Sequence, residues 1–436
     1  MTGSLERQFA LRDAPGRADD SENTKWGHVP LRRCFRIVSG STPSSAEPKY
    51  WDGEITWVTP EDLGRLSGRG ISASERGITA AGVASIGNRE VPAGSLVLST
   101  RAPIGHVGVA NVSLCTNQGC KSLVPLPGID VQYAYYQLLA RRPELERLGT
   151  GTTFAELGRD QLASLRFWRP EVQTQHAIAD FLDRETEKID TLVAKKQRLI
   201  ELLNEKRSAL VERVALGGLR GRGAGKSLGI GRATVPSTWA VRRARYVMRE
   251  RDERSSDGAE DLLTVSHITG VTLRSEKQVS MFEAESNEGY KVCRTGDLAV
   301  NTMWAFMGAA GVAPCNGIVS PSYNVYRFLV QGEPRYYDYL VRTSTYVSEF
   351  ASRSKGIWRS RLRLYPAQLL DIALPVPPLR EQEEIVRYLD KQTSAIDGLI
   401  EPCRRSIELL KERRSALVTA AVSGQIDVRK YTMGMS

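Results

Sequence analysis

The chain has 436 residues, of which 41% are hydrophobic and 25% are charged, a composition that excludes an intrinsically disordered protein. Lys and Arg exceed Asp and Glu by 60 to 50, a balance that suits a polyanionic partner without requiring one. The six cysteines are scattered and the four histidines lack ligand spacing, so the sequence predicts a cytoplasmic protein with reduced thiols and no metal site. No apolar run reaches the ~20 residues that span a membrane.

The chain begins with a polar segment, residues 1–25, which lacks the apolar core of a signal peptide and is predicted to be a flexible tail. Residues 26–169 follow as a first globular stretch, in which short β-like runs alternate with turns rich in Gly and Pro. This pattern predicts a first domain that ends where a helical pattern starts.

Residues 170–217 are predicted to form one long helix. Pro170 before the pattern and Gly217 after it mark its two ends. About 42 helical residues would make a rod of roughly 60 Å. The apolar residues approximate heptads and therefore predict a coiled-coil seam. This seam is Ile178, Leu182, Ile189, Leu192, Leu199, Leu203 and Leu210.

A basic, glycine-rich linker is predicted over residues 218–235. Its beginning superficially resembles a phosphate-binding loop, because it contains the run from Gly225 to Ser227, Gly-Lys-Ser. However, the position five before Gly225 is Arg220 rather than Gly, and the preceding element is a predicted helix rather than a strand. The segment is therefore interpreted as a flexible linker whose side chains at most touch phosphates.

A second globular stretch, residues 236–376, presents landmarks in the same order as the first. Elsewhere the two stretches differ strongly, which predicts a common scaffold with divergent detail. The paired landmarks are Val91–Val97 with Arg294–Val300, Gly108–Ala110 with Gly311–Ala313, and the tyrosine-rich helices 133–139 and 336–341.

The chain ends with a second copy of the long helix, followed by a predicted tail over residues 425–436. Residues 170–217 align with 377–424 at a constant offset of 207, and about 21 of the 48 positions are identical. Chance similarity between amphipathic helices does not hold register over this length. One departure is Pro402, which replaces Lys195 and is expected to kink the second helix or to split it into two segments.

The reach of the chain predicts how these parts are arranged. The linker of about 18 residues stretches at most roughly 60 Å, so returning the second domain to the first would use all of it. The economical arrangement leaves the second domain at the far end of the first helix, with the second helix returning antiparallel. The predicted fold class is therefore α+β, with two domains joined by two long helices that form an antiparallel coiled coil with a pseudo-twofold axis.

Catalytic signatures are mostly absent from the sequence. It contains no [Asn/Asp]-Pro-Pro-aromatic tetrapeptide of amino-methyltransferases and no convincing set of carboxylates with a lysine for metal-dependent DNA cleavage. We therefore predict no catalytic and no metal-binding residues. The competing hypothesis, a self-contained methyltransferase or nuclease, requires turnover by the purified chain with S-adenosylmethionine or Mg²⁺.

The remaining polar features suit contacts with DNA, because Arg pairs with guanine edges, Asn and Gln with adenine edges, and Lys with phosphate. Singly, each has an ordinary structural explanation: Asn117 would cap a turn and Trp304 would belong to the core. Their occurrence as sets on two matching domains favours DNA contact. The candidates are Arg101, Asn117, Gln118, Lys121 and Phe154 in the first domain and Asn301, Trp304, Tyr323, Lys355, Trp358 and Arg359 in the second.

A set of short segments spread along the chain carries a resemblance to a known family. These segments are Tyr50–Thr59, Val91–Ser95, Ser99–Gly105, Thr116–Leu123, Gly151–Phe154, Asn301–Met303, Ser320–Tyr323 and Leu374–Ile385. With them, from Trp26 onward, the sequence resembles the specificity subunits of type I restriction–modification enzymes. The resemblance adds Thr153 and Ser320 to the DNA-binding candidates. The chain departs from the family pattern at Arg169–Glu171, where a Pro-Pro pair is usual, and at Pro402.

The resemblance implies that each globular stretch is a target-recognition domain with a mixed α/β fold, and that the two domains read the two parts of a split DNA sequence. It implies further that the helices dock two methyltransferase subunits, which two motor-nuclease subunits join for restriction. S-adenosylmethionine, ATP and Mg would be bound by those partners, and no cofactor by this chain.

Two alternatives remain open at the level of sequence. A modification-only DNA methylation complex would use the same kind of subunit, and a motor-nuclease gene next door would distinguish full restriction from it. A coiled-coil scaffold that binds only proteins would be excluded by specific, salt-sensitive binding to a bipartite DNA site.

Overall fold

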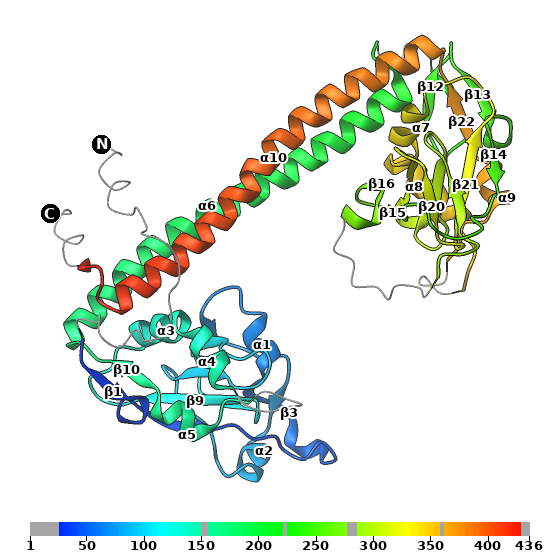
Figure 1. Cartoon of the computed structure of the whole chain (residues 1–436). Coiled ribbons are helices and arrows are strands. Elements are labelled where there is room, and N and C mark those ends of the chain that lie inside the picture. Colours follow the sequence, from blue (N-terminus) through cyan, green and yellow to red (C-terminus); the bar gives the residue numbers. More distant parts are fainter. Residues whose placement is uncertain (1–25, 150–155, 221–224, 277–285, 358–361, 429–436) are drawn as a thin grey trace. The chain divides into compact units, whose positions relative to one another are not determined.

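The computed structural model describes residues 26–149, 156–220, 225–276, 286–357 and 362–428 (Figure 1). The chain divides into two compact units: the first unit comprises Met1–Ala194 with Ser406–Ser436, and the second unit comprises Lys195–Arg405. Each unit holds one globular domain and a part of each of two long helices. These helices are α6 (Val172–Gly217) and α10 (Leu379–Val422).

The first domain is built on a five-stranded sheet with the order β2–β9–β6–β7–β4, accompanied by a three-stranded sheet, β5–β3–β8, and the pair β1–β10. The strands are β1 (His28–Pro30), β2 (Phe35–Ser39), β3 (Trp51–Val58), β4 (Gly70–Ile71), β5 (Gly77–Ile78), β6 (Leu96–Ser99), β7 (Val107–Ala110), β8 (Leu114–Thr116), β9 (Cys120–Pro125) and β10 (Arg166–Trp168). The helices are α1 (Pro60–Gly64), α2 (Ala80–Ser85), α3 (Val131–Ala140), α4 (Arg142–Leu148) and α5 (Arg159–Ser164).

The second domain has a four-stranded sheet, β14–β21–β18–β19, and the pairs β11–β12, β13–β22, β15–β16 and β17–β20. The strands are β11 (Gly225–Ser227), β12 (Thr234–Pro236), β13 (Ala240–Arg243), β14 (Met248–Arg251), β15 (Leu263–Ser266), β16 (Gly270–Leu273), β17 (Lys291–Cys293), β18 (Leu298–Asn301), β19 (Ala310–Val312), β20 (Gly317–Val319), β21 (Tyr323–Phe328) and β22 (Ala373–Val376). The helices are α7 (Pro334–Val341), α8 (Ser344–Arg353) and α9 (Pro366–Leu370).

The two domains share one scaffold. Strand order β2–β9–β6–β7 in the first domain corresponds to β14–β21–β18–β19 in the second. Successive side chains of the central strands enter different apolar clusters, since a strand points alternate residues to opposite faces. Leu96 and Leu98 of β6 pack in one cluster and Val97 in another. Leu298 and Ala299 of β18 divide in the same way.

Part of the predicted flexible linker is folded. Strands β11 and β12 pair antiparallel, and Leu228, Ile230 and Val235 are buried in the core of the second unit. These three apolar residues are spaced among Gly, Lys and Arg, which obscured them in the sequence. Because Gly225–Ser227 is a strand of this hairpin and does not open a helix, the segment is not a phosphate-binding loop.

The least exposed residues of each long helix lie on one stripe, at alternating steps of three and four residues. In α10 this stripe contains Leu389, Thr393, Ile396, Ile400 and Ile407, all of which are buried. In α6 the equivalent positions are Leu182, Thr186, Ile189, Val193 and Ile200, of which Val193 is partly buried and the others are buried. Pairs of such steps sum to seven residues, in agreement with the predicted heptad spacing. The predicted members Leu192 and Leu199 are wrong, because they are about half exposed and the stripe passes through Val193 and Ile200 instead.

Ion pairs between the helices confirm that they run antiparallel. In the first unit Arg414 of α10 binds Asp190 of α6 at 2.9 Å, and in the second unit Arg207 of α6 lies 3.4 Å from Asp397 of α10. Each pair is the repeat equivalent of the other at the offset of 207.

Among the described residues, no helix combines the length and the hydrophobicity that a membrane span requires.

The predicted splitting of the second helix at Pro402 does not occur, since α10 is continuous through this residue. A proline ring crowds the carbonyl of the residue four positions earlier and donates no hydrogen bond to it. That residue is Gly398, which has open space where a Cβ would lie, whereas the equivalent residue in α6 is Thr191. A glycine backbone adjusts more freely, and we attribute the continuity of the helix to it.

Replacing Pro402 by Ala is expected to raise the free energy of unfolding by about 1–3 kcal/mol, because the substitution restores a helical donor at an exposed position. The reverse substitution at the equivalent position, Lys195→Pro, is expected to cost more than Pro402→Ala gains, since no glycine precedes it. Thermal and denaturant unfolding of the full chain measure both changes. A Pro402→Ala protein no more stable than wild type contradicts this assignment.

Candidate nucleic-acid interface

In the first domain, two loops at one end of the central strands lie together. The loop after β6 meets the turn between β8 and β9, because the Thr100 N–H donates to the Gly119 carbonyl at 2.7 Å. Asn117 stabilises this turn: its side-chain oxygen accepts from the Gly119 N–H at 3.0 Å, as expected of a capping residue. Gln118 is exposed at the tip, where its Oε1 accepts a hydrogen bond from Thr42.

Arg101 and Lys121 occupy different depths of this site. Arg101 is exposed and binds Glu156 at 3.0 Å, whereas Lys121 is 4% exposed. The Lys121 ammonium donates to the Leu157 carbonyl at 2.9 Å and to Thr100 at 3.2 Å, and burial lowers its pKa. This burial argues against a direct phosphate contact by Lys121 and indicates that it supports the loop that carries Arg101.

The second domain repeats this arrangement with other side chains. The Thr302 hydroxyl, just after β18, donates to the Ser322 carbonyl at 2.7 Å, which joins the loop after β18 to the turn before β21. Asn301 is buried and accepts from the Met303 N–H at 3.2 Å. Trp304 is 49% exposed and stacks on Phe306. It therefore does not belong to the core, which was the structural explanation considered for it from the sequence.

Ser320 and Tyr323 form the turn itself. The Tyr323 N–H donates to the Ser320 carbonyl at 2.9 Å, and the Ser320 and Ser322 hydroxyls are hydrogen-bonded at 2.9 Å. Tyr323 is partly buried, and this burial raises the pKa of its hydroxyl. The tyrosine is therefore neutral at physiological pH and available as a hydrogen-bond donor.

A third segment completes each site. In the first domain the Leu157 N–H donates to the Thr100 carbonyl, and in the second the Leu364 N–H donates to the Thr302 carbonyl. Lys355 is exposed, and its backbone forms two hydrogen bonds of 2.9 Å with Arg363. The four remaining candidates lie outside the described residues. They are Thr153, Phe154, Trp358 and Arg359.

Three residues of these sites were missed in the sequence: Arg363, Glu156 and Ile357. Arg363 lies beside the Thr302 loop, where the position equivalent by the 207-residue offset is Glu156 in the first domain. The chain thus places a base in one domain where the other has an acid. Extending the repeat offset upstream from the helices would have found this pair. Ile357, which is 95% exposed next to Lys355, has no counterpart signal in the sequence.

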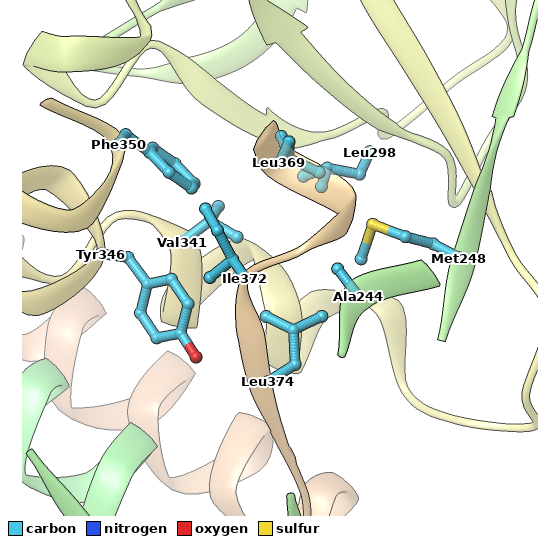
Figure 2. A pocket seen from close by; sticks show the side chains of 9 residues that line it. All are labelled: Ala244, Met248, Leu298, Val341, Tyr346, Phe350, Leu369, Ile372 and Leu374. Carbon is cyan, nitrogen blue, oxygen red and sulfur yellow. The ribbon is translucent and has the colours of Figure 1, made fainter. Parts of the chain in front are cut away.

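The described residues offer little for a cofactor. No group of three or more His, Cys, Asp or Glu side chains among them is placed to hold a metal ion. A small cavity in the second domain is lined by apolar side chains such as Met248, Leu298 and Phe350 (Figure 2). The Tyr346 hydroxyl, its polar group, donates to the Ala373 carbonyl at 2.7 Å. This cavity therefore presents no free polar group to a ligand.

Comparisons with known proteins point to one family. Residues 23–202 match the model of a family described as the type I restriction modification DNA specificity domain. The type I restriction enzyme MjaIX specificity subunit of Methanocaldococcus jannaschii is 33% identical over 182 residues, 41% of this chain and 41% of that protein. A putative MjaX specificity subunit of the same organism is 24% identical over 199 residues, 45% of this chain and 44% of that protein. The matches thus span less than half the length of these relatives.

The fold is shared over almost the whole chain. A chain from a structure described as the basis of complex assembly and conformational transition of the type I R-M system superposes with a TM-score of 0.68. The superposition covers 92% of this chain and 98% of that chain, at 14% identity. The predicted fold class, two mixed α/β domains with two long helices packed together, is thereby confirmed.

The different depths of Arg101 and Lys121 predict different effects on DNA binding. Arg101→Ala is expected to weaken binding of target DNA by about 1–3 kcal/mol, the usual value of a direct base contact. It should leave thermal stability nearly unchanged, since exposed ion pairs contribute little. Lys121→Met is expected to lower the melting temperature, because a buried carbonyl loses its donor.

Binding isotherms and thermal unfolding of the two variants, measured side by side, check this prediction. An Arg101→Ala protein that binds target DNA as tightly as wild type would remove Arg101 from the interface.

Proposed function

We propose that the chain is the DNA specificity subunit of a type I restriction–modification enzyme, on the premise that residues 23–202 match the family of type I restriction modification DNA specificity domains. In this role the chain recognises a bipartite DNA target and docks the catalytic subunits. It contributes no catalytic residue of its own.

The observation that carries the proposal is a pair of like scaffolds with unlike loops. Both domains bring the loop after the central strand against a turn and a third segment. At these places the first domain exposes Arg101 and Gln118 beside Glu156, whereas the second exposes Trp304 and Lys355 beside Arg363. Polar side chains in the first domain, and an aromatic side chain with basic neighbours in the second, recognise different base edges. Two unlike half-sites follow, separated by bases that neither domain reads.

The duplicated helices suit the task of fixing the distance between the half-sites. Two domains that read the major groove from one face of DNA need centres about one helical turn, roughly 34 Å, apart or a multiple of it. A rod of 46 residues, the length of α6, is long enough for such separations. We propose that the unread spacer is set by these helices.

Exposed leucines on the helices mark the surface that we propose docks two methyltransferase subunits. Leu192 and Leu399 are repeat equivalents and are 47% and 58% exposed. Leu202 and Leu409, also equivalents, are 46% and 64% exposed. One leucine of each pair lies in each unit, so the first and second units carry the same apolar anchors. Exposed apolar residues maintained in both copies are typical of a protein interface.

Two motor-nuclease subunits join the methyltransferase complex in this proposal, and the assembly acts in the cytoplasm on chromosomal DNA. S-adenosylmethionine, ATP and Mg are bound by these partners. A modification-only complex is the second candidate, because the described residues of this chain serve a methylating complex equally well. The presence or absence of a motor-nuclease gene beside this one separates the two.

The function is tested by co-expressing the full chain with the methyltransferase subunit encoded beside it and sequencing the methylated bases of the host genome. Methylation at one split sequence, together with binding of that DNA that weakens steeply with salt, is the expected result. Methylation without a gapped motif, or turnover by the chain alone with S-adenosylmethionine, would contradict the proposal.

Charges placed at the leucine anchors are expected to release the methyltransferase subunits. Leu192→Asp with Leu399→Asp should weaken association at least roughly tenfold, since a carboxylate would be buried without a partner in the interface. Gln197→Asp, at another exposed position of α6, is the matched control. Co-purification and light scattering measure the complex, and unchanged stoichiometry in the leucine variants would place the docking surface elsewhere.

A further inference from the structure

Each globular domain is tied to the long helices by the same small set of hydrogen bonds. The set centres on the tyrosine-rich helix of the domain, α3 in the first unit and α7 in the second. We call this set the joint. It consists of Arg69, Tyr133, Tyr136, Asp183 and Thr186 in the first unit and Arg335, Tyr336, Tyr339, Asp390 and Thr393 in the second.

In the first unit the joint fastens α3 to α6. The Tyr136 hydroxyl donates to Asp183 at 2.6 Å and lies 3.1 Å from the Thr186 hydroxyl. The Arg69 guanidinium donates two hydrogen bonds to the same carboxylate, of 2.5 and 2.8 Å. Burial alone would raise the pKa of Asp183, but the hydrogen bonds from Arg69 and Tyr136 outweigh it, so the pKa is lowered. The carboxylate is therefore charged, and both contacts are charge-assisted.

The second unit builds the equivalent joint between α7 and α10. The Tyr339 hydroxyl donates to Asp390 at 2.8 Å and lies 3.3 Å from Thr393. Arg335 binds Asp390 with two hydrogen bonds, of 2.8 and 2.6 Å. Asp390 and Thr393 are the 207-residue equivalents of Asp183 and Thr186. The same three contacts thus occur at the same place in both units.

The arginines do not come from equivalent positions. Arg69 precedes strand β4, whereas Arg335 belongs to α7 itself. Duplication explains the recurrence of the tyrosine, the aspartate and the threonine, but it does not explain two arginines that reach the same carboxylate from different parts of the fold. Such convergence indicates that the contact itself is needed at both joints.

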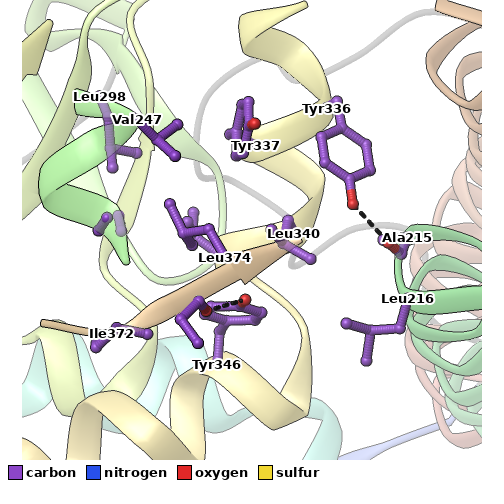
Figure 3. Close-up of a cluster of buried hydrophobic side chains, with 14 of the residues drawn as sticks. Ala215, Leu216, Val247, Leu298, Tyr336, Tyr337, Leu340, Tyr346, Ile372 and Leu374 are labelled. Carbon is purple, nitrogen blue, oxygen red and sulfur yellow. Dashed lines mark hydrogen bonds between the residues drawn. The ribbon is translucent and has the colours of Figure 1, made fainter. Parts of the chain in front are cut away.

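A second tyrosine fastens each domain to the other long helix. The Tyr133 hydroxyl shares its proton between the Val422 carbonyl of α10 at 3.3 Å and the Trp168 carbonyl at 3.2 Å. The Tyr336 hydroxyl donates to the Ala215 carbonyl of α6 at 2.9 Å, as Figure 3 shows. Val422 and Ala215 are again equivalents. Both lie in the last turn of a helix, where carbonyls have no intrahelical donor. Each tyrosine-rich helix therefore binds α6 and α10 at once.

We propose that the joint is the positioning element that fixes the orientation of each target-recognition domain on the helices and thereby makes the enzyme discriminate the spacer length. This inference rests on the proposed function. A spacer changed by one base pair moves a half-site by about 3.4 Å and rotates it by about 35°. A rigid domain cannot follow this movement without strain, whereas a domain on a loosened joint can.

The test uses the full chain co-expressed with its methyltransferase subunit, with genomic methylation as the readout. Tyr136→Phe with Tyr339→Phe removes two hydroxyls, and Asp183→Asn with Asp390→Asn breaks both arginine pairs. In each double variant, methylation of sites with spacers one base pair longer or shorter is expected to rise roughly tenfold relative to cognate sites. The half-sites should stay unchanged, because the DNA-reading loops are intact.

Tyr337 provides the matched control, since it lies on α7 beside Tyr336 and its buried hydroxyl has no hydrogen-bond partner among the described residues. Tyr337→Phe should leave the spacer preference as in wild type. A fall in melting temperature with unaltered spacer discrimination in the joint variants would show that these residues only stabilise the fold, and would overturn the inference.

A second measurement separates the joint from the proposed function. Spin labels at Ser113 in the first domain and Glu187 on α6, both exposed, report the orientation of the domain in the free full-length chain. The distance distribution is expected to broaden in the joint variants and to stay narrow in Tyr337→Phe. If wild type methylates no bipartite site, the proposed function fails, and these distributions still decide whether the joint positions the domain.

Discussion

In each unit of this protein the two long helices meet along a stripe of heptad spacing, and the rest of the structure depends on that contact. In the first unit Ile178 of α6 shares an apolar cluster with Val418 of α10, and in the second Val211 of α6 shares one with Leu389 of α10. Alternating steps of three and four residues keep the buried side chains on one face of each helix. The ion pair between Asp190 and Arg414 recurs between the equivalent residues, which fixes the antiparallel register twice.

Much of the fold could be predicted because the duplication of the domain and its long helix is still detectable as an internal repeat of the sequence. The constant offset of 207 residues identifies both helices, and the ordered landmarks identify a shared scaffold that the strand orders confirm. The predicted heptad stripe was misplaced at Leu192 and Leu199, because leucines occupy both buried and exposed positions of these helices and only the partner helix decides which face is buried. The hairpin over β11 and β12 was not predicted for a similar reason. Its apolar residues are few, and only the tertiary packing shows that they are buried.

The candidate site was less predictable, because exposure depends on neighbours distant in sequence. Lys121 had the chemistry of a phosphate ligand, yet the Leu157 carbonyl and Thr100 hold its ammonium inside. Trp304 had the chemistry of a core residue, yet it is half exposed. The joint shows the same limit, since Arg69 and Arg335 converge on equivalent carboxylates from positions that no alignment pairs. Side chains that meet across the fold leave no periodic signal along the chain.

The most direct test of this account lengthens the helices in steps that preserve their stripe. Three added heptads after Arg198, and three after the equivalent Arg405, extend each helix by about 32 Å, close to one turn of DNA. Sequencing of methylated genomic DNA should then show the same two half-sites with a spacer about ten base pairs longer. An unchanged spacer, or half-sites that differ from those of wild type, would contradict the claim that the duplicated helices hold two unlike readers apart.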